Sequence, residues 1–265
     1  MRSFEGKVVI ITGSGSGIGL STALAFAKEG ASVTIADVNE TSGIETLSKI
    51  KELGGRGISI KADVSISADC HLVVTETINA FNRIDILFNN CGIQPPNAFL
   101  NVEDLPEELW DQMLAVNLKS YYLMSKYAIP EIRKMGGGAI VNTASVQGLQ
   151  SERLLPAYAA SKGAVLSLTR QMALDYAKEN IRVLAVCPGS IDTPMNRAIA
   201  TQEPGNVDDT MRAWGRKHPL GRMGTGEDIA HAVLFLASEK ASFMTGEYIN
   251  VDGGLMAQGA WTTTH

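Results

Sequence analysis

Residues 7–19 read Lys7-Val8-Val9-Ile10-Ile11-Thr12-Gly13-Ser14-Gly15-Ser16-Gly17-Ile18-Gly19. The β-branched first half is typical of a strand buried on both faces, and the glycine-rich second half leads into a helical pattern. Glycines allow positive φ and let backbone N–H groups approach a pyrophosphate at a helix N-terminus, where the helix dipole favours anions. The spacing is Thr-Gly-x-x-x-Gly-x-Gly, because Ile18 stands where the usual Gly-x-Gly-x-x-Gly has its last glycine. Its position after an apolar strand still predicts the first unit of a dinucleotide-binding fold.

The rest of the chain repeats this alternation of short apolar strands and longer amphipathic helices. Strand patterns fall at 7–12, 32–36, 57–60, 85–88, 139–142 and 181–186, and helical patterns at 19–28, 40–53, 68–81, 106–134 and 157–178. Such alternation, with right-handed crossovers, predicts an α/β fold with a doubly wound parallel sheet and helices on both faces. Because no linker interrupts the 265 residues, we expect one domain. Residues 190–223, with two short helical patterns between prolines and glycines, are expected to form a substrate lid.

Composition narrows the class of protein further. With 23 Lys+Arg against 28 Asp+Glu, the net charge of -5 has the wrong sign for gripping nucleic acid, so we expect a small-molecule substrate instead. No stretch is apolar enough to cross a membrane, and the start of the sequence lacks the apolar core of a signal peptide, which favours the cytoplasm. The 3 cysteines and 4 histidines show no metal-ligand spacing, so we expect reduced thiols and no metal.

Asp37 directly follows the second strand pattern and indicates which nicotinamide cofactor is bound. A carboxylate at this place can accept hydrogen bonds from both ribose hydroxyls of NAD and would repel the 2′-phosphate of NADP. The alternative is that Asp37 caps the helix expected at 40–53. No arginine lies in the glycine loop or beside Asp37 to receive a 2′-phosphate, so the sequence favours NAD.

Further motifs follow in the order Asn89-Asn90-Cys91-Gly92, Asn117, Ser145, Tyr158-Ala159-Ala160-Ser161-Lys162 and Pro188-Gly189. Together with residues 12–19, they make the whole chain similar to the classical short-chain dehydrogenase/reductase family. The resemblance implies a single Rossmann-type domain with a seven-stranded parallel sheet, a Ser-Tyr-Lys catalytic set assisted by Asn117, and a homotetramer. Cys91 stands where the family usually has alanine, and we interpret its small thiol as neutral packing.

The chemistry of alcohol oxidation agrees with these residues. Hydride transfer from a carbinol to nicotinamide needs a base for the hydroxyl proton, and a tyrosine serves only if its pKa falls by roughly three units, or about 4 kcal/mol. Lys162, one helical turn after Tyr158, and the positive charge of oxidised nicotinamide would both lower that pKa. Ser145, just past a buried strand, would hydrogen-bond the substrate oxygen. Tyr122 and Lys126 have the same spacing, but they lie mid-helix and are interpreted as structural.

The resemblance also implies a larger set of cofactor contacts. Asn117 would hold a water that connects Lys162 to solvent, Asp63 and Asn89 would border the adenine, and Thr193 would contact the nicotinamide amide. Alternatively, Asp63 and Thr193 are helix caps, and Asn89 and Asn117 are buried amides. The predicted cofactor residues are Gly13, Ser14, Gly17, Ile18, Gly19, Asp37, Asp63, Val64, Asn89, Gly92, Tyr158, Lys162, Pro188, Gly189, Ile191 and Thr193.

The substrate is the least determined part. The predicted contacts are Gln94, Ser145, Gln147, Gln150, Arg153 and Tyr158. Their amides and guanidinium favour a sugar, a polyol or a related hydroxy compound. Met195, Met211 and Trp214 in the lid could equally cover a steroid, a terpene alcohol or an acyl chain. The basic residues of the lid could meet an anionic substrate, but we interpret them as a solvated helix face.

The sequence therefore predicts an NAD-dependent oxidoreductase that interconverts a secondary alcohol and a ketone, or a sugar hemiacetal and a lactone. The alternatives are a 3-oxoacyl-thioester reductase and a hydroxysteroid or cyclic-alcohol dehydrogenase. An epimerase or dehydratase of the extended branch would need a larger C-terminal domain, and a non-catalytic NAD sensor would have no use for the catalytic set. By resemblance, helices 106–134 and 157–178 would supply a subunit interface. The tail 255–265, with Trp261, could reach a neighbouring subunit or fray.

Overall fold

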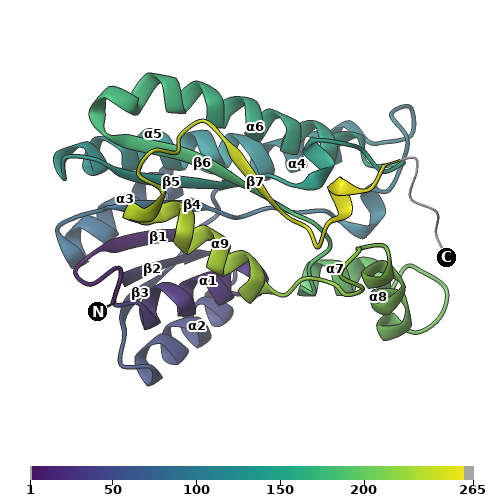
Figure 1. The fold of residues 1–265 in the computed structure, drawn as a ribbon, viewed down its shortest axis with the longest axis horizontal. Coiled ribbons are helices and arrows are strands. Elements are labelled where there is room, and N and C mark those ends of the chain that lie inside the picture. Colours follow the sequence, from purple (N-terminus) through teal and green to yellow (C-terminus); the bar gives the residue numbers. More distant parts are fainter. Residues whose placement is uncertain (1, 260–265) are drawn as a thin grey trace.

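The computed structural model describes residues 2–259, in which seven parallel strands form one sheet in the order β3-β2-β1-β4-β5-β6-β7 (Figure 1). The order reverses between β1 and β4, and ligands of doubly wound sheets bind outside the carboxyl ends of the strands at such a point. The strands are β1 Val8–Thr12, β2 Ser32–Asp37, β3 Arg56–Lys61, β4 Ile86–Asn89, β5 Gly138–Thr143, β6 Ile181–Pro188 and β7 Tyr248–Val251.

Helices cover both faces of this sheet, and Figure 1 shows α5 and α6 on the side opposite to α1, α2 and α9. One layer holds α1 Gly17–Lys28, α2 Glu40–Glu52 and α9 Gly226–Ala237, and the other holds α3 Ser67–Phe81, α5 Ser120–Lys134 and α6 Pro156–Tyr176. The side chains of β1 alternate between the two layers: Val9 and Ile11 join the core under α1, whereas Ile10 joins the core under α3 and α5. Burial on both faces explains why the strands are continuous apolar runs.

The predicted doubly wound α/β fold is confirmed, and the main differences concern three elements. The single helix expected at 106–134 is instead α4 Glu107–Leu114, a π-helical turn at Ala115–Lys119, and α5. Strand β7 and helix α9 were not located by the sequence patterns, although the resemblance implied a seventh strand. None of the helices within residues 2–259 is long and apolar enough to cross a membrane.

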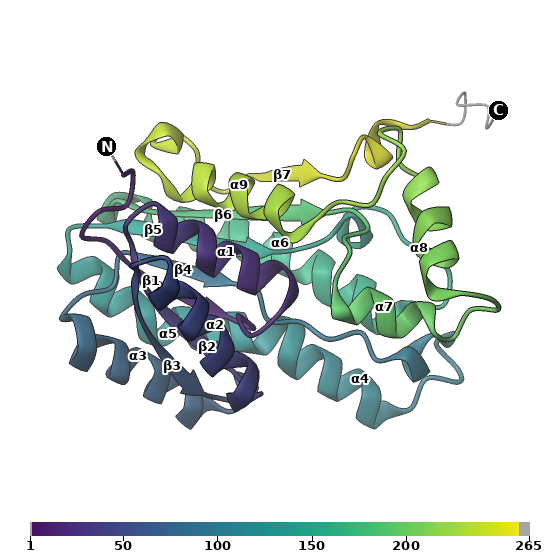
Figure 2. The same cartoon turned by 90° about the horizontal axis from the view of Figure 1, so that it is seen from below.

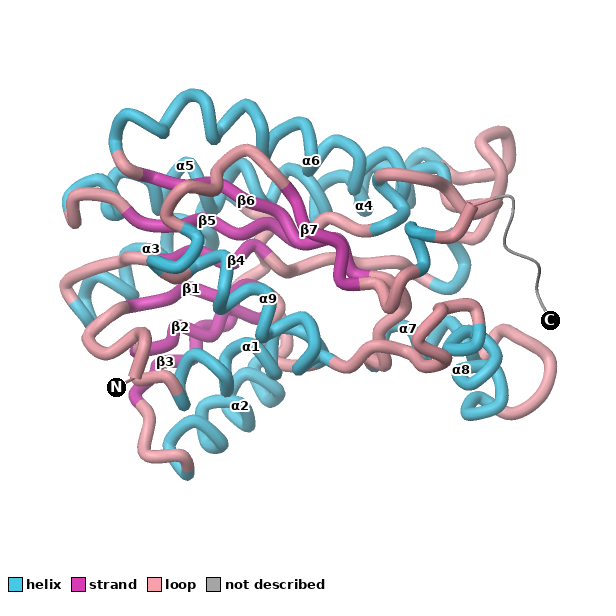
Figure 3. Tube along the Cα trace, in the orientation of Figure 1, coloured by secondary structure: helices cyan, strands magenta, loops and turns pink. Residues whose placement is uncertain are grey.

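The region predicted as a lid contains two short helices, α7 Pro194–Ala200 and α8 Val207–Arg216. Figure 2 shows both beyond the carboxyl ends of the strands, and Figure 3 shows the loops that join them to β6 and α9. The lid therefore lies at the edge of the sheet where a ligand is expected. Trp261, for which a contact to a neighbouring subunit was considered, lies outside the described residues.

Candidate active site

The glycine loop after β1 packs closely against the start of α1. Gly13 and Gly17 adopt φ values of 64° and 51°, which favour glycine. A Cβ atom on Gly19 would lie 2.1 Å from the carbonyl oxygen of Gly13, so only glycine lets the helix begin this close to the loop. Asn90 fastens the loop from the other side, because its amide donates to the carbonyl oxygens of Thr12 (3.0 Å) and Gly13 (3.2 Å). The result is a rigid cradle at a helix N-terminus, which suits a pyrophosphate.

Asp37 ends β2 and lies against this cradle. Its Oδ2 accepts a hydrogen bond from the N–H of Gly15 at 2.8 Å, and its Oδ1 accepts one from the N–H of Asn39 at 2.9 Å. The alternative that Asp37 caps α2 is wrong, because Asn39 is the cap and accepts from the N–H of Ser42. The carboxylate is thus fixed beside the glycine loop, in the place expected for recognition of a ribose.

The other predicted adenine contacts occupy two kinds of environment. Asp63 lies on the surface and accepts hydrogen bonds from the N–H and hydroxyl of Ser65, whereas the neighbouring Val64 side chain is buried in the core. Asn89 is fully buried, and its amide donates to Asn142 Oδ1 at 2.9 Å and to a serine hydroxyl on α5. The hydrogen bonds of its Nδ2 group therefore agree with the interpretation of Asn89 as a buried amide.

The segment after β6 links the glycine loop to the lid. Thr193 caps α7 by accepting from the N–H of Asn196, and its methyl group would lie 3.2 Å from a Cβ atom on Gly17. The N–H of Ser190 donates to Nε2 of the buried His218 at 3.1 Å. Nε2 therefore accepts, so Nδ1 carries the proton and donates to the carbonyl oxygen of Trp214. His218 ties the lid to the strand end that carries the predicted residues Pro188, Gly189 and Ile191.

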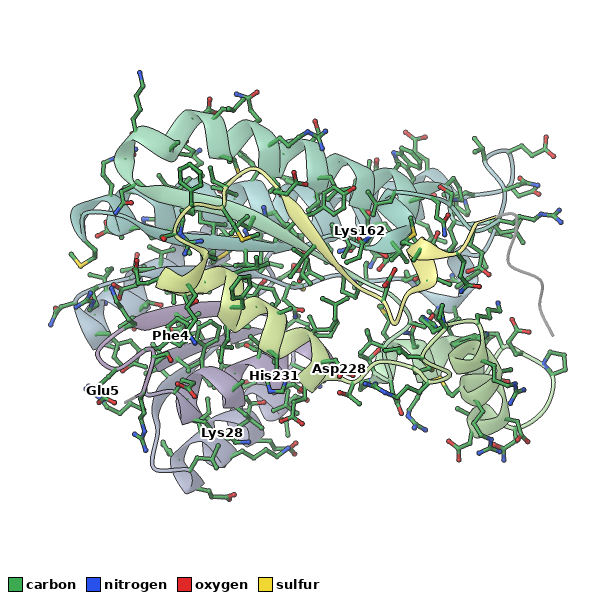
Figure 4. The ribbon with its side chains drawn as sticks, in the orientation of Figure 1. Phe4, Glu5, Lys28, Lys162, Asp228 and His231 are labelled. Atoms are coloured by element: carbon green, nitrogen blue, oxygen red, sulfur yellow. The ribbon has the colours of Figure 1, made fainter. Side chains whose placement is uncertain are left out.

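Ser145, Tyr158 and Lys162 come together at the carboxyl edge of the sheet. Ser145 lies just past the end of β5, after Ala144, and its Oγ accepts from the N–H of Gln147 at 3.1 Å. Tyr158 and Lys162 lie one turn apart near the start of α6, and both are buried. The Lys162 Nζ lies 5.7 Å from the centre of the Tyr158 ring. Figure 4 labels Lys162 between α6 and the sheet.

Burial controls the charges of these two residues. It raises the pKa of Tyr158 to about 12, although a hydrogen bond with Ser145 opposes the shift. It lowers the pKa of Lys162 to about 8. Burial disfavours the charged phenolate, so without bound cofactor the pKa of Tyr158 lies above its usual value. The thiol of Cys91 also has a pKa raised by burial, which agrees with a packing role.

Asn117 lies in the π-helical turn and holds the segment after β4. Its Oδ1 accepts from the N–H of Ile93 at 2.7 Å, and its Nδ2 donates to the carbonyl oxygen of the same residue at 2.9 Å. A Cβ atom on Gly92 would lie 3.4 Å from Lys162 Nζ and 3.5 Å from Asn117 Oδ1, so the glycine makes room for both side chains. Asn117 thus fixes the backbone that precedes Gln94.

The residues predicted to bind substrate differ in whether their polar groups are free to contact a ligand. Gln147 is used within its own loop, because its Oε1 accepts from the N–H of Glu152 at 2.7 Å. Gln150 and Arg153 are exposed, and Gln94 is half-buried. By contrast, the ring of Tyr158 belongs to an apolar cluster; its other members are Ile93, Ala98, Phe99, Leu105, Leu109, Trp110, Met113, Leu155 and Ala157. The surroundings of Tyr158 are therefore less polar than the sequence predicted.

The structure agrees with a solvated position for the basic lid residue Arg197 and with a structural role for Tyr122 and Lys126. Arg197 pairs with Asp192 and Asp208 on the surface, so this lid charge is neutralised within the protein. Tyr122 lies on an exposed face of α5, where Lys126 approaches its ring. A hollow of ≈ 550 Å³ beside α6 is lined by Asn101 and Val102, by residues of the 147–156 loop, and by Ala159 and Ala160 on α6. It adjoins the loop that carries the predicted substrate contact Gln147.

Three residues with structural roles at the site were not singled out from the sequence. Asn90 was part of the quoted motif, and its contact to the glycine loop could have been inferred from its place after β4. His218 and Tyr121 carried no signal of their own, because each meets its partners through tertiary contacts between distant segments. Tyr121 is fully buried and donates to the carbonyl oxygen of Thr143, which also accepts from Lys162.

Comparisons with known proteins cover almost the whole chain. Residues 13–256 match the family model described as enoyl-(acyl carrier protein) reductase. An uncharacterised oxidoreductase of Thermotoga maritima is 44% identical over 96% of this chain and 99% of its own. A cyclohexanol dehydrogenase of Acinetobacter sp. is 39% identical over 95% of this chain and 96% of its own. The ligand-free aldohexose dehydrogenase of Thermoplasma acidophilum superposes with a TM-score of 0.88 at 34% identity, covering 100% of this chain and 99% of that one.

Proposed function

The chain belongs to the classical short-chain dehydrogenase/reductase family and is an oxidoreductase acting on CH–OH groups, and from this premise we propose that it is an NAD-dependent dehydrogenase. It interconverts a secondary alcohol and a ketone, or a hemiacetal and a lactone. The observation that carries the proposal is the arrangement at one sheet edge of a glycine cradle with Asp37 and of Ser145, Tyr158 and Lys162.

The residues present fit a dinucleotide. The cradle at the start of α1 suits a pyrophosphate, and the Asp37 carboxylate beside it favours ribose hydroxyls over a 2′-phosphate. Bound oxidised nicotinamide would accept the hydride and bring a positive charge near Tyr158. That added charge would be needed to lower the pKa of Tyr158 from about 12, which explains why the base would act only once the cofactor is bound.

Side chains of the protein would then remove the proton of the substrate hydroxyl and stabilise its oxygen. Tyr158 would take the proton of the substrate hydroxyl, and Ser145 would donate a hydrogen bond to the oxygen as its charge changes. The Lys162 ammonium favours the tyrosinate by electrostatic attraction. Asn117 would keep the adjoining backbone in place through its paired hydrogen bonds to Ile93.

For the substrate we propose a compact ring alcohol. Support comes from the apolar cluster around Tyr158 and from the engagement of Gln147 within its own loop, which leaves fewer free amides than a polyol would use. An aldose is the second candidate. It is favoured by the half-buried Gln94 next to the segment fixed by Asn117, and by the similarity to an aldohexose dehydrogenase.

The test is the initial rate of reduced-nicotinamide formation with NAD or NADP and a panel of cyclic alcohols, aldoses, polyols, sterols and 3-hydroxyacyl thioesters. Tyr158→Phe is the blank, and Tyr122→Phe is the matched control because Tyr122 has the same spacing to a lysine. NAD-linked oxidation of a ring alcohol, lost in the blank and kept in the control, is the expected result. A preference for NADP would refute the role of Asp37, and turnover confined to acyl thioesters would refute the substrate class.

We also propose a cytoplasmic homotetramer with an interface along α5 and α6. Leu174 on α6 is 79% exposed, so this helix presents apolar surface that a second copy would cover. The three cysteines are free thiols, which agrees with a reducing compartment. Light scattering coupled to gel filtration gives the assembly, and a monomeric mass would refute it.

A further inference from the structure

Lys162 is held by a group of atoms that the catalytic set does not include. Its Nζ donates to the carbonyl oxygen of Thr143 at 2.8 Å and to the hydroxyl of Tyr121 at 3.5 Å. The Tyr121 hydroxyl itself donates to the same Thr143 carbonyl at 3.1 Å. Because the proton of Tyr121 is directed at Thr143, the lone pairs of its oxygen are available to the ammonium.

The ring of Tyr121 makes a second contact with the same charge. The Nζ of Lys162 lies 5.5 Å from the centre of the Tyr121 ring and 5.7 Å from that of Tyr158. Both distances lie within the range over which a cation is attracted to an aromatic ring. The ammonium thus lies near two tyrosine rings that come from different helices, α5 and α6.

We propose that Tyr121 is a positioning residue for the catalytic lysine, because its hydroxyl and ring together hold the Lys162 ammonium in place and in its charged form beside Tyr158. Tyr121 and Thr143 engage two of the three N–H groups of the ammonium, which leaves one for a bound ligand or water. The inference rests on the proposed function, since it assigns Lys162 its catalytic role.

The charge of Lys162 depends on such acceptors. Within residues 2–259, no carboxylate forms an ion pair with Lys162, and the titratable groups that face it are Tyr158 on its own helix, Tyr121 on α5, Cys91 after β4 and Cys187 on β6. All four are neutral acids in the protein, because burial raises each pKa. Burial lowers the pKa of Lys162 to about 8. The loss of one acceptor would therefore change the protonation of Lys162 close to neutral pH.

The test compares Tyr121→Phe with Tyr122→Phe, the neighbouring exposed tyrosine. Phenylalanine keeps the ring and the packing and removes only the hydroxyl. The pKa of Lys162 is measured by carbon NMR on lysine-labelled protein without cofactor, with Lys162→Met used to assign the signal. In Tyr121→Phe we expect the pKa to fall by about half a unit, and the alkaline limb of the pH–rate profile to move down equally. Tyr122→Phe should change neither.

An unchanged Lys162 pKa and pH profile in folded Tyr121→Phe would overturn the inference and leave Tyr121 as packing. The same measurement on unsubstituted protein made with 3-fluorotyrosine, whose hydroxyl is a weaker acceptor, keeps the inference testable even if the variant folds poorly, because an unchanged Lys162 pKa there would overturn it as well. The NMR measurement needs no substrate. A shifted pKa in a protein that oxidises no alcohol would refute the proposed function and retain the contact, whereas alcohol oxidation with an unshifted pKa would do the reverse.

Discussion

Gly19→Ala should weaken cofactor binding strongly and destabilise the fold moderately. A Cβ atom at this position would lie 2.1 Å from the Gly13 carbonyl oxygen and 2.8 Å from the Asn90 amide nitrogen. Contacts of a real Cβ atom essentially never fall below 3.0 Å, so the start of α1 must move away from the glycine loop by roughly 1 Å. The amide of Asn90 lies in the same place and would lose its hydrogen bond to Gly13.

The size of the effect follows from these contacts. Overpacking at a rigid site costs about 1–3 kcal/mol and the lost hydrogen bond about 1 kcal/mol, while alanine returns about 1 kcal/mol of helix propensity. The net loss is about 2 kcal/mol, which lowers the Tm of a domain of this size by about 4–8 °C. Displacement of the N–H groups that would face the pyrophosphate by about 1 Å should weaken NADH binding by about 100-fold.

Calorimetric titration of NADH and thermal unfolding followed by circular dichroism test this prediction. Gly163→Ala is the matched control, because a Cβ atom there would lie 3.6 Å from the nearest atom, the Gly148 carbonyl oxygen, which is an ordinary contact. The control should gain about 1 kcal/mol of stability and bind NADH unchanged. If Gly19→Ala bound NADH within threefold of the wild type at an unchanged Tm, the argument from close packing would be wrong.

Three further changes test the site. Asp37→Asn keeps the shape of the side chain and removes its charge, so the ratio of kcat/KM for NAD over NADP should fall at least about tenfold; an unchanged ratio would show that the charge does not select the cofactor. Because burial lowers the pKa of Lys162 from 10.5 to about 8, the unfolded chain holds this proton more tightly, and the wild type should gain stability as pH rises from about 8 to 10.5. Lys162→Met should lack this gain, so urea unfolding should show that the wild type gains stability relative to the variant between pH 7 and pH 10, and an equal change in both proteins would contradict it. His218→Ala leaves the Ser190 N–H and the Trp214 carbonyl unpaired, so KM should rise more than kcat falls, and limited proteolysis should cut within 190–223; a resistant lid would count against this role.

The sequence predicted best the elements whose identity depends on local pattern. Strand β1 and the glycine loop could be located because β-branched residues and glycines each restrict the backbone in a known way. Strand β7 was missed because Tyr248–Val251 is short and lies at the edge of the sheet. None of its four residues is fully buried, so it lacks the continuous apolar run of the inner strands. The π-helical turn was missed because it accompanies the tertiary hydrogen bonds of Asn117 to Ile93, which no local pattern encodes.

The same distinction applies to the charges. The spacing of Tyr158 and Lys162 predicted their proximity, because one helical turn separates them. It could not predict that burial would dominate the pKa of both residues, since burial depends on segments as distant as β4, β6 and α5. Gln147 likewise was predicted as a free amide, but its partner is a backbone N–H in the same loop.

The division between rigid and irregular segments also explains why the reaction class is easier to infer than the substrate. Ser145 follows the end of β5, and Tyr158 and Lys162 lie near the start of α6, so the proposed catalytic groups are held by regular elements. The groups that would touch the rest of the substrate lie after β4, in the 147–156 loop and in the lid, whose conformations depend on single contacts such as Gln147 to Glu152 and His218 to Ser190. Changes in these three segments can alter the pocket without moving the catalytic atoms. Relatives named for cyclohexanol and for aldohexoses can therefore share this fold, and exchange of the 147–156 loop between them should change KM for the two substrate classes more than kcat.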